Sequence, residues 1–367
     1  MKKDISAMDL YFLTQEFQVL EGGKVDKIFQ KQDNKRDILF RFHVPSVGKK
    51  MLRILLPGKI FLTEYKEEYP EVPPGYCMFL RKYLGNARLR KIEQQGFERI
   101  LKLTFERKKE EISELFVLVI ELFSKGNIIL CNEDMKIRSP LENQNWADRT
   151  IRGGIIYQYP PTQIDTPQLK ENEFKETLQK STKQSVVKSL AIDFGLGGEY
   201  AEETCALSGI EKEDKTKSAD SAKIFKAVQN ILAGKIQSVE AEGHILPFAF
   251  KSLPDEKKKF KTFSEAIDEL FTDKTEQKTA KEVKPDKTSR MITAQEQKIS
   301  GYEKAAEENQ KKGEFIYEHY TEIKDIIDQL NKAREKYSWK DIKKKLKGHK
   351  LIKQIDEKEG KIVIDLK

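Results

Sequence analysis

The sequence has 367 residues, of which 38% are hydrophobic and 35% are charged, and its formal net charge is +8. Its mean hydropathy of −0.65 is low for one compact globule. We therefore expect about two or three domains, with one elongated part that has little core. The basic excess favours a polyanionic partner such as nucleic acid, although a solvated lysine-rich surface would give the same net charge.

Several classes of protein do not fit the pattern of residues. The 3 cysteines are widely spaced and form no CxxC pair, which argues against a disulfide framework or a zinc site and favours a reducing compartment. The first residues do not read as a signal peptide, and no stretch reaches the roughly 18 apolar residues of a membrane span. We expect a cytoplasmic protein with no membrane partner, metal or cofactor.

Residues 1–165 are predicted to form a β-rich domain. A helix is expected over residues 5–20, with one face buried. The residues after it alternate between strand and turn patterns. The inward residues of this helix are Leu10, Leu13, Phe17 and Leu20. The expected strands cover residues 24–30, 37–44, 50–56, 59–63, 112–123 and 127–131. They follow one another too closely for βαβ units, so we predict an antiparallel sheet or sandwich and an α+β fold class.

The stretch from Val72 to Arg107 combines a short helix with a basic segment. Apolar residues from Tyr76 to Leu84 follow helical spacing, and Gly85 ends the helix. After the Gly96 turn, a strand should bury its alternate residues. Between these elements we expect a basic, turn-rich edge with Arg88, Arg90 and Lys91. We predict that Arg81 and Lys82 of the helix, together with Arg88 and Arg90, form a surface that faces a nucleic-acid backbone.

Residues 166–272 are predicted to form a helical domain. Helices are expected over residues 171–179, 184–194, 200–207, 220–232 and 263–271, with a strand over 244–250. Between the second and third of them, Gly195, Gly197 and Gly198 form the pattern of a helix-hairpin-helix. Glycines at such a turn expose backbone N–H groups that can bind phosphate. A tight turn that needs glycine only for steric reasons is the alternative.

The rest of the chain is predicted to be a charged linker over residues 273–290 and a long helix within residues 291–367. Apolar residues from Ile299 to Tyr337 follow a heptad pattern, with one break at Arg334. A basic cluster and a β-hairpin over residues 351–366 follow. Because a heptad stripe needs a partner helix, we expect a homodimer through this seam, or a returning helix beyond the end of this chain.

Motifs for catalysis are scarce, and we predict that the protein is not an enzyme. The sequence has no GxSxG, Walker A, HExxH or Rossmann glycine pattern. Asp9, Glu98 and Arg99 are the charged residues that we single out. A carboxylate accepts and a guanidinium donates in a fixed fork, so neighbouring charges at a turn can read a base edge. A surface ion pair of negligible energy is the alternative.

Several motifs together resemble the NFACT family, which comprises the NEMF-like and RqcH-like ribosome quality-control tailing factors, also known as fibronectin-binding proteins. The resemblance covers nearly the whole chain. The segments that carry it, besides Asp9, are GKVDKIFQ, PPGYCMFLRKYLGNARL, QQGFERIL, SKGNIILCN, YQYPP, GLGGEYAEE, FSEAIDELF and GYEKAAEENQKKGEFIYEHY.

The resemblance implies both a fold and a function. The N-terminal domain should be similar to that of formamidopyrimidine-DNA glycosylases, followed by a helix-hairpin-helix domain, a coiled coil and a small middle domain. Such proteins bind the large ribosomal subunit (rRNA and ribosomal proteins) when it is obstructed by peptidyl-tRNA with its nascent chain. They recruit tRNA for mRNA-independent tailing of that chain. Residues that match Asp9, Glu98 and Arg99 would bind tRNA, and the family commonly has Asp where Glu98 stands.

Three other hypotheses are weaker or fail. A glycosylase would need an N-terminal proline and a zinc finger, but here Lys2 follows Met1 and the cysteines are scattered. A fibronectin-binding adhesin would need an export signal. A protein-interaction scaffold that dimerises through the heptad seam, with incidental nucleic-acid binding, is the alternative function.

Overall fold

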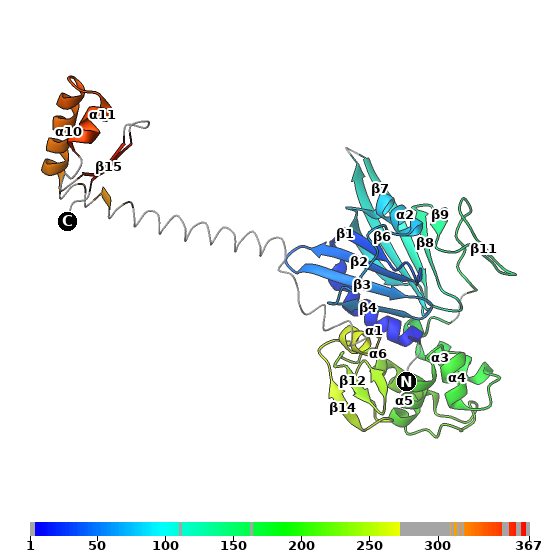
Figure 1. Ribbon diagram of the computed structural model, residues 1–367. Coiled ribbons are helices and arrows are strands. Elements are labelled where there is room, and N and C mark those ends of the chain that lie inside the picture. Colours follow the sequence, from blue (N-terminus) through cyan, green and yellow to red (C-terminus); the bar gives the residue numbers. More distant parts are fainter. Residues whose placement is uncertain are drawn as a thin grey trace. The chain divides into compact units, whose positions relative to one another are not determined.

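The computed structural model describes residues 4–109, 112–161, 164–271, 309, 312–313, 316, 319–346, 352–356 and 361–364. The chain divides into two compact units, Met1–Glu282 and Val283–Lys367 (Figure 1). The first unit combines a large sheet and the two helices that pack on it with a helical region that follows them in the chain. The second is smaller and contains helices and a β-hairpin.

The first unit is built on one nine-stranded antiparallel sheet, with strand order β4-β3-β2-β1-β5-β6-β7-β8-β9. Its strands are β1 (Lys24–Gln30), β2 (Asp37–Val44), β3 (Gly48–Leu55), β4 (Lys59–Thr63), β5 (Arg88–Gln94), β6 (Ile100–Lys109), β7 (Ile112–Glu121), β8 (Asn127–Asn132) and β9 (Ile137–Pro140). The short strands β10 (Gln144–Asn145) and β11 (Thr150–Ile151) form a separate hairpin. The mixed α+β class with a large antiparallel sheet is therefore confirmed.

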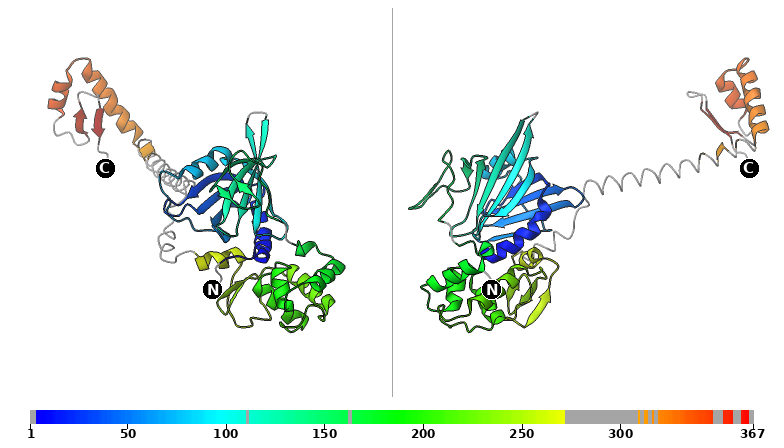
Figure 2. Two further views of the ribbon diagram at one scale, coloured as in Figure 1. Left: turned by 90° about the vertical axis from the view of Figure 1, so that its right-hand side faces the viewer. Right: turned by 180° about the vertical axis from the view of Figure 1, so that it is seen from behind.

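Two helices pack against this sheet, α1 (Ala7–Phe17) and α2 (Gly75–Leu84). A 3-10 turn, η1 (Gln18–Leu20), extends α1. The four apolar residues predicted to point inward from the first helix are all 0% exposed. Both views in Figure 2 place α1 between the sheet and the helical region. This helix therefore belongs to the core of both parts.

The basic segment after α2 differs from the prediction. Residues 88–94 form β5, an interior strand between β1 and β6, and not a turn-rich edge. Leu89 and Ile92 bury its inner face, while Arg88 and Arg90 point to solvent. A register shift between Leu89 and Lys91 interrupts the alternation, which is why the pattern did not show a strand. In β6 the alternation is regular, and the predicted burial of its apolar residues is confirmed.

The helical region contains α3 (Glu171–Lys180), α4 (Val186–Ile192), α5 (Gly198–Ser208), α6 (Ser221–Leu232) and α7 (Phe263–Phe271). A 3-10 turn, η2 (Thr166–Gln168), precedes them, and β12 (Val239–Ala241), β13 (His244–Leu246) and β14 (Glu256–Lys259) form a small sheet. The predicted helices are present, whereas β12 and β14 were missed. Glu16 of α1 accepts hydrogen bonds from the backbone N–H groups of Phe263 (2.6 Å) and Ser264 (2.9 Å), so α1 caps α7.

The second unit contains α10 (Tyr320–Arg334), α11 (Trp339–Lys345) and the antiparallel pair β15 (Ile352–Asp356) and β16 (Lys361–Ile364). The predicted terminal hairpin is therefore confirmed. The predicted seam does not run on to Tyr337, because α10 ends at Arg334 and Leu330 packs with Ile342 of α11. Residues 273–308, which include the predicted linker and the start of the long helix, lie outside the described residues.

Candidate functional site

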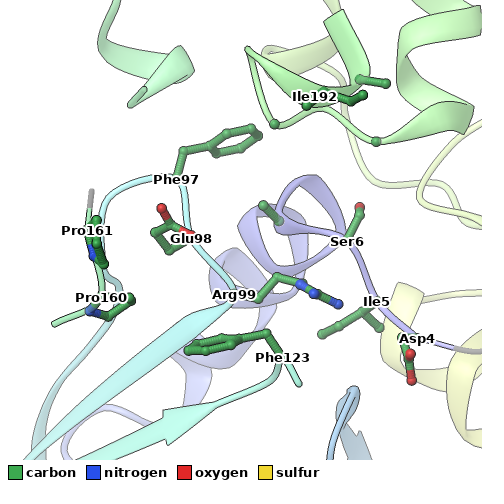
Figure 3. Close-up of a pocket in the computed structure, with 14 residues that line it drawn as sticks. Asp4, Ile5, Ser6, Phe97, Glu98, Arg99, Phe123, Pro160, Pro161 and Ile192 are labelled. Atoms are coloured by element: carbon green, nitrogen blue, oxygen red, sulfur yellow. The ribbon is translucent and has the colours of Figure 1, made fainter. Parts of the chain in front are cut away.

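A cavity of about 610 Å³ lies between the sheet and the helical region of the first unit (Figure 3). It brings together Glu98, Arg99, Gly195 and Gly197, four of the residues singled out from the sequence. The remaining lining residues come from the start of α1, from the turns around the sheet and from α4. They are Asp4, Ile5, Ser6, Ala7, Phe97, Phe123, Pro160, Pro161, Ala191 and Ile192.

The turn between β5 and β6 positions the two charged residues. Gly96 has φ +53°, a conformation that favours glycine, and it allows the chain to reverse before Glu98. The Gln94 side chain donates hydrogen bonds to the backbone oxygens of Ala7 (2.9 Å) and Glu98 (2.8 Å). One amide thus ties the turn to the first residue of α1. These backbone contacts position Glu98 and Arg99 in the wall of the cavity.

Arg99 is the cation that lines this cavity. Its backbone oxygen accepts a hydrogen bond from the Leu122 N–H (2.8 Å), which fixes the start of β6. Its half-buried side chain extends towards Ile5 and Ser6 at the start of α1 (Figure 3). Within the described part of the chain, its guanidinium has no hydrogen-bond or ion-pair partner. A guanidinium has five N–H donors in a planar fork, so this group can bind a ligand without breaking an existing contact.

The glycine turn between α4 and α5 forms the opposite wall. Gly195 and Gly197 have φ +66° and +78°, and buried Leu196 anchors the turn between them. The Gly197 N–H donates to the Ala191 oxygen (3.1 Å), which closes α4 before α5 begins at Gly198. The predicted arrangement of two helices joined by a glycine turn is therefore present. Gly198 lies at the exposed first position of α5, next to the cavity residues.

Asp9 lies inside the protein and is 0% exposed. One carboxylate oxygen accepts hydrogen bonds from the Ser6 backbone N–H (2.7 Å) and hydroxyl (2.8 Å), which completes a capping box at the start of α1. The other accepts from the Tyr200 hydroxyl of α5 at 2.7 Å. Burial, and next the Asp9 carboxylate, raise the pKa of Tyr200, so the phenol keeps its proton and donates. Asp9 thus links the start of α1 to α5 in the protein interior, and these two elements contribute to opposite walls of the cavity.

A buried ion pair supports the Phe123 side of the cavity. Arg149 donates to both Glu121 oxygens, at 2.6 and 3.2 Å, and the Tyr157 hydroxyl also donates to Glu121 (2.7 Å). Burial, followed by the Glu121 charge, raises the pKa of Tyr157. The Arg149 guanidinium carbon lies 5.6 Å from the centre of the Phe123 ring, so this network fixes the ring from behind.

The predicted basic edge lies away from the cavity. Arg88 is at the far end of β5, about 20 Å from Gln94 at the end next to the Gly96 turn, at about 3.3 Å per residue. Arg81 donates to the Ile28 backbone oxygen (2.7 Å), Arg88 to the Gly22 oxygen (2.6 Å) and Arg90 to Glu106 (2.6 Å). Lys82 is exposed. These four residues do not form one surface with Glu98 and Arg99.

The composition of the cavity suits a flat ligand that has both donors and acceptors. Arg99 supplies donors, Glu98 and Asp4 supply acceptors, and Phe97 and Phe123 supply apolar rings. A nucleobase combines an aromatic face with a polar edge, whereas the two carboxylates disfavour a phosphate close to them. The aromatic and proline residues were not predicted as site residues, because only the fold brings their segments together.

No metal site or membrane span is found in the parts of the chain that the structure describes. Within these parts, no group of three or more His, Cys, Asp or Glu side chains could hold a metal ion. The three cysteines are buried and free. None of the helices found there is long and apolar enough to cross a membrane.

Comparison with known proteins identifies the family. Residues 6–364 match the family described as NFACT N-terminal and middle domains. The archaeal Rqc2 homolog aRqcH of Methanocaldococcus jannaschii is 33% identical over 400 residues, which cover 100% of this chain and 59% of that protein. The Rqc2 homolog RqcH of Bacillus subtilis is 25% identical over 84% of this chain and 56% of its own length. This chain thus spans little more than half the length of these relatives.

A sequence match over a shorter segment and a structural alignment agree with this family assignment. Ribosome quality control complex subunit 2 of Saccharomyces cerevisiae is 36% identical over 150 residues, which are 40% of this chain and 14% of that protein. The N-terminal part of the fibronectin/fibrinogen-binding protein of Streptococcus suis aligns with a TM-score of 0.62 and 25% identity, over 73% of this chain and 99% of that one. With its N-terminal and middle domains matched from residue 6 to residue 364, the chain belongs to the NFACT family.

Proposed function

We propose that this chain, which matches the NFACT N-terminal and middle domains, acts in ribosome quality control. It binds a large ribosomal subunit, through rRNA and ribosomal proteins, when peptidyl-tRNA obstructs that subunit. It then recruits tRNA for mRNA-independent C-terminal tailing of the stalled chain. The names of its relatives in archaea, bacteria and yeast support the assignment to ribosome quality control. The protein acts in this scheme as an adaptor and not as an enzyme, because the ribosome forms the peptide bonds.

The observation that carries the tRNA part of the proposal is the half-buried Arg99 guanidinium in a cavity with aromatic walls. Arg99 and Glu98 would bind the polar edge of an unstacked base, while Phe97 and Phe123 contact its face. Asp9 would act indirectly, because its carboxylate is buried and already bonded to Ser6 and Tyr200. The backbone N–H groups at the start of α5 would lie beside the adjoining phosphate.

An Arg99→Ala variant tests this proposal. A bidentate arginine contact to a base contributes about 1–3 kcal/mol, so tRNA affinity should fall about 5- to 150-fold. Arg152→Ala is the matched control, because Arg152 is an exposed arginine outside the cavity. Fluorescence anisotropy with labelled tRNA measures the affinity, and co-sedimentation with large ribosomal subunits measures ribosome binding. Equal loss of both activities in Arg99→Ala would contradict a separate tRNA site.

Two structural expectations belong to the same proposal. The likeness to the N-terminal domain of formamidopyrimidine-DNA glycosylases is supported by the antiparallel sheet with α1 packed on it. The coiled coil is supported by the apolar spacing along α10. We retain both as parts of the proposed architecture.

An exposed apolar stripe in the second unit favours a second candidate function, that of a protein-interaction scaffold. Ile316, Tyr320 and Ile327 are 53%, 57% and 47% exposed and follow heptad spacing. Such a stripe would pair with a helix of a partner or of a second copy of this chain. Light scattering with and without tRNA separates the two functions. A stable dimer whose mass does not change when tRNA is added favours the scaffold.

A further inference from the structure

Four basic side chains surround the ring of Phe29 on the first unit. Their charged centres lie within 6 Å of the ring centroid: Lys66 at 4.9 Å, Lys27 at 5.4 Å, Arg41 at 5.6 Å and Arg81 at 5.9 Å. We call this group the Phe29 cluster. Ile28 faces the core that α1 covers, so the alternation along β1 places Phe29 on the opposite face of the sheet. The cluster shares no residue with the cavity around Arg99.

Two carboxylates next to the cluster, Asp26 and Glu67, are already paired. Asp26 bonds Arg41 at 2.6 Å. Glu67 pairs with Lys31 at 2.8 Å and with Arg53. By contrast, Lys27 and Lys66 are exposed, and neither forms an ion pair with any residue in the described part of the chain. The outer surface of the cluster therefore carries uncompensated positive charge.

This accumulation of charge costs stability in the free protein. Lys27 and Arg41 lie directly opposite each other on β1 and β2, where like charges are destabilising. Burial lowers the pKa of Lys66, and the charges of Arg41 and Lys27 lower it further. Attraction to a single aromatic ring does not explain why four cations that repel one another gather around it. A local electrostatic cost at an exposed site that the ion pair of Arg41 and the hydrogen bond of Arg81 do not remove for Lys27 and Lys66 is typical of a binding surface.

We propose that the Phe29 cluster is a second RNA-contact surface, which binds the phosphodiester backbone and does not read its sequence. The choice of RNA as the polyanion rests on the proposed function. Phe29 is 6% exposed and forms the floor of the surface, so bases do not stack on it. Phosphates would lie over Lys27 and Lys66, with Arg41 between them and the sheet. A bound backbone would offset the repulsion that these side chains experience in the free protein.

The test compares the double variant Lys27→Gln/Lys66→Gln with the control Lys175→Gln/Lys226→Gln. The control removes the same charge from exposed lysines of α3 and α6. Affinity for a labelled RNA duplex and for tRNA is measured by anisotropy across a salt series. For the cluster variant, the slope of log affinity against log salt should become shallower by about 2 with the duplex. A slope equal to that of the control would overturn the proposal.

Two further arms make the result specific. Arg99→Ala should leave duplex binding unchanged, because a paired base cannot enter the cavity. If Arg99→Ala weakens tRNA binding while the cluster variant does not weaken RNA binding, the proposed function stands and the cluster proposal fails. If the cluster variant is defective but Arg99→Ala is not, the cavity assignment fails instead. Polyglutamate of equal charge that binds the cluster as tightly as RNA would assign the surface to an acidic polypeptide and overturn the proposal.

Discussion

Removing the Tyr200 hydroxyl should loosen the cavity without changing any residue that lines it. In Tyr200→Phe, the Asp9 oxygen that accepts at 2.7 Å loses that donor in a fully buried place. A hydrogen bond to a charged group contributes about 1.5–3 kcal/mol, and the buried carboxylate gains no water in exchange. The free energy of unfolding should fall by this amount, which lowers the melting temperature by about 3–10 °C.

The functional effect follows from the positions of the two residues. Asp9 is on α1 and Tyr200 is on α5, so this bond joins the wall that carries Ser6 to the wall that carries Gly197. We expect Tyr200→Phe to reduce tRNA affinity several-fold through the geometry of the cavity. Ribosome co-sedimentation should not change, because the outer surface is intact.

Tyr76→Phe is the matched control. The Tyr76 hydroxyl donates to the Ile128 backbone oxygen at 2.6 Å, within the sheet region and against a neutral acceptor. Its loss should cost about 0.5–1.5 kcal/mol and leave tRNA binding unchanged. Thermal unfolding and tRNA anisotropy are measured on both variants. Our reasoning is refuted if Tyr200→Phe has the melting temperature of the wild type. It is also refuted if the tRNA affinity falls by the same factor in both variants.

Two other predictions concern the glycine turn and the acid response. Gly197 has φ +78° and ψ 169°, a backbone conformation that is essentially restricted to glycine. Gly197→Ala should therefore lower the free energy of unfolding by about 1–3 kcal/mol and weaken tRNA binding. Gly198→Ala, in open space at the start of α5, should be neutral or stabilising, and similar melting curves for the two variants would contradict this view. Burial acts to raise the pKa of Glu67, but Lys31 and Arg53 together outweigh it and lower that pKa. This stabilisation is present above the ordinary pKa of about 4.5 and is lost as the pH falls through the lowered value. Urea unfolding from pH 3 to 7 should therefore show a weaker acid dependence in Glu67→Gln, and an unchanged curve would show that the pair contributes nothing.

Regular hydrophobic patterns made much of the fold predictable. The strands over residues 24–30, 37–44 and 59–63 and the helix over 263–271 lie where the periodicity placed them. β5 was missed because a bulge interrupts its alternation and most of its residues are charged. The end of α10 was missed because spacing alone does not show that α11 turns back to cover Leu330.

The candidate site was predictable in its charged residues and glycines, but not in its architecture. Glu98 and Arg99 stand next to a turn glycine, which local sequence shows. The burial of Asp9 depends on Tyr200, which is 191 residues away in the chain. The Phe29 cluster likewise draws residues from two strands, a loop and a helix. Such contacts arise from tertiary structure, and no local spacing encodes them.

The two carboxylates of α1 also bear on the order in which the protein is made. Asp9 bonds a residue 191 positions later, and Glu16 bonds one 247 positions later. At about 5–20 residues per second, α1 would wait roughly 10–40 s after synthesis for Tyr200 to be added. A nascent chain shorter than 200 residues would leave Asp9 without this donor and Phe12 without the ring of Tyr200 stacked against it. The first helix to be synthesised is thus among the last to be completed, and an interrupted chain would still expose part of its core.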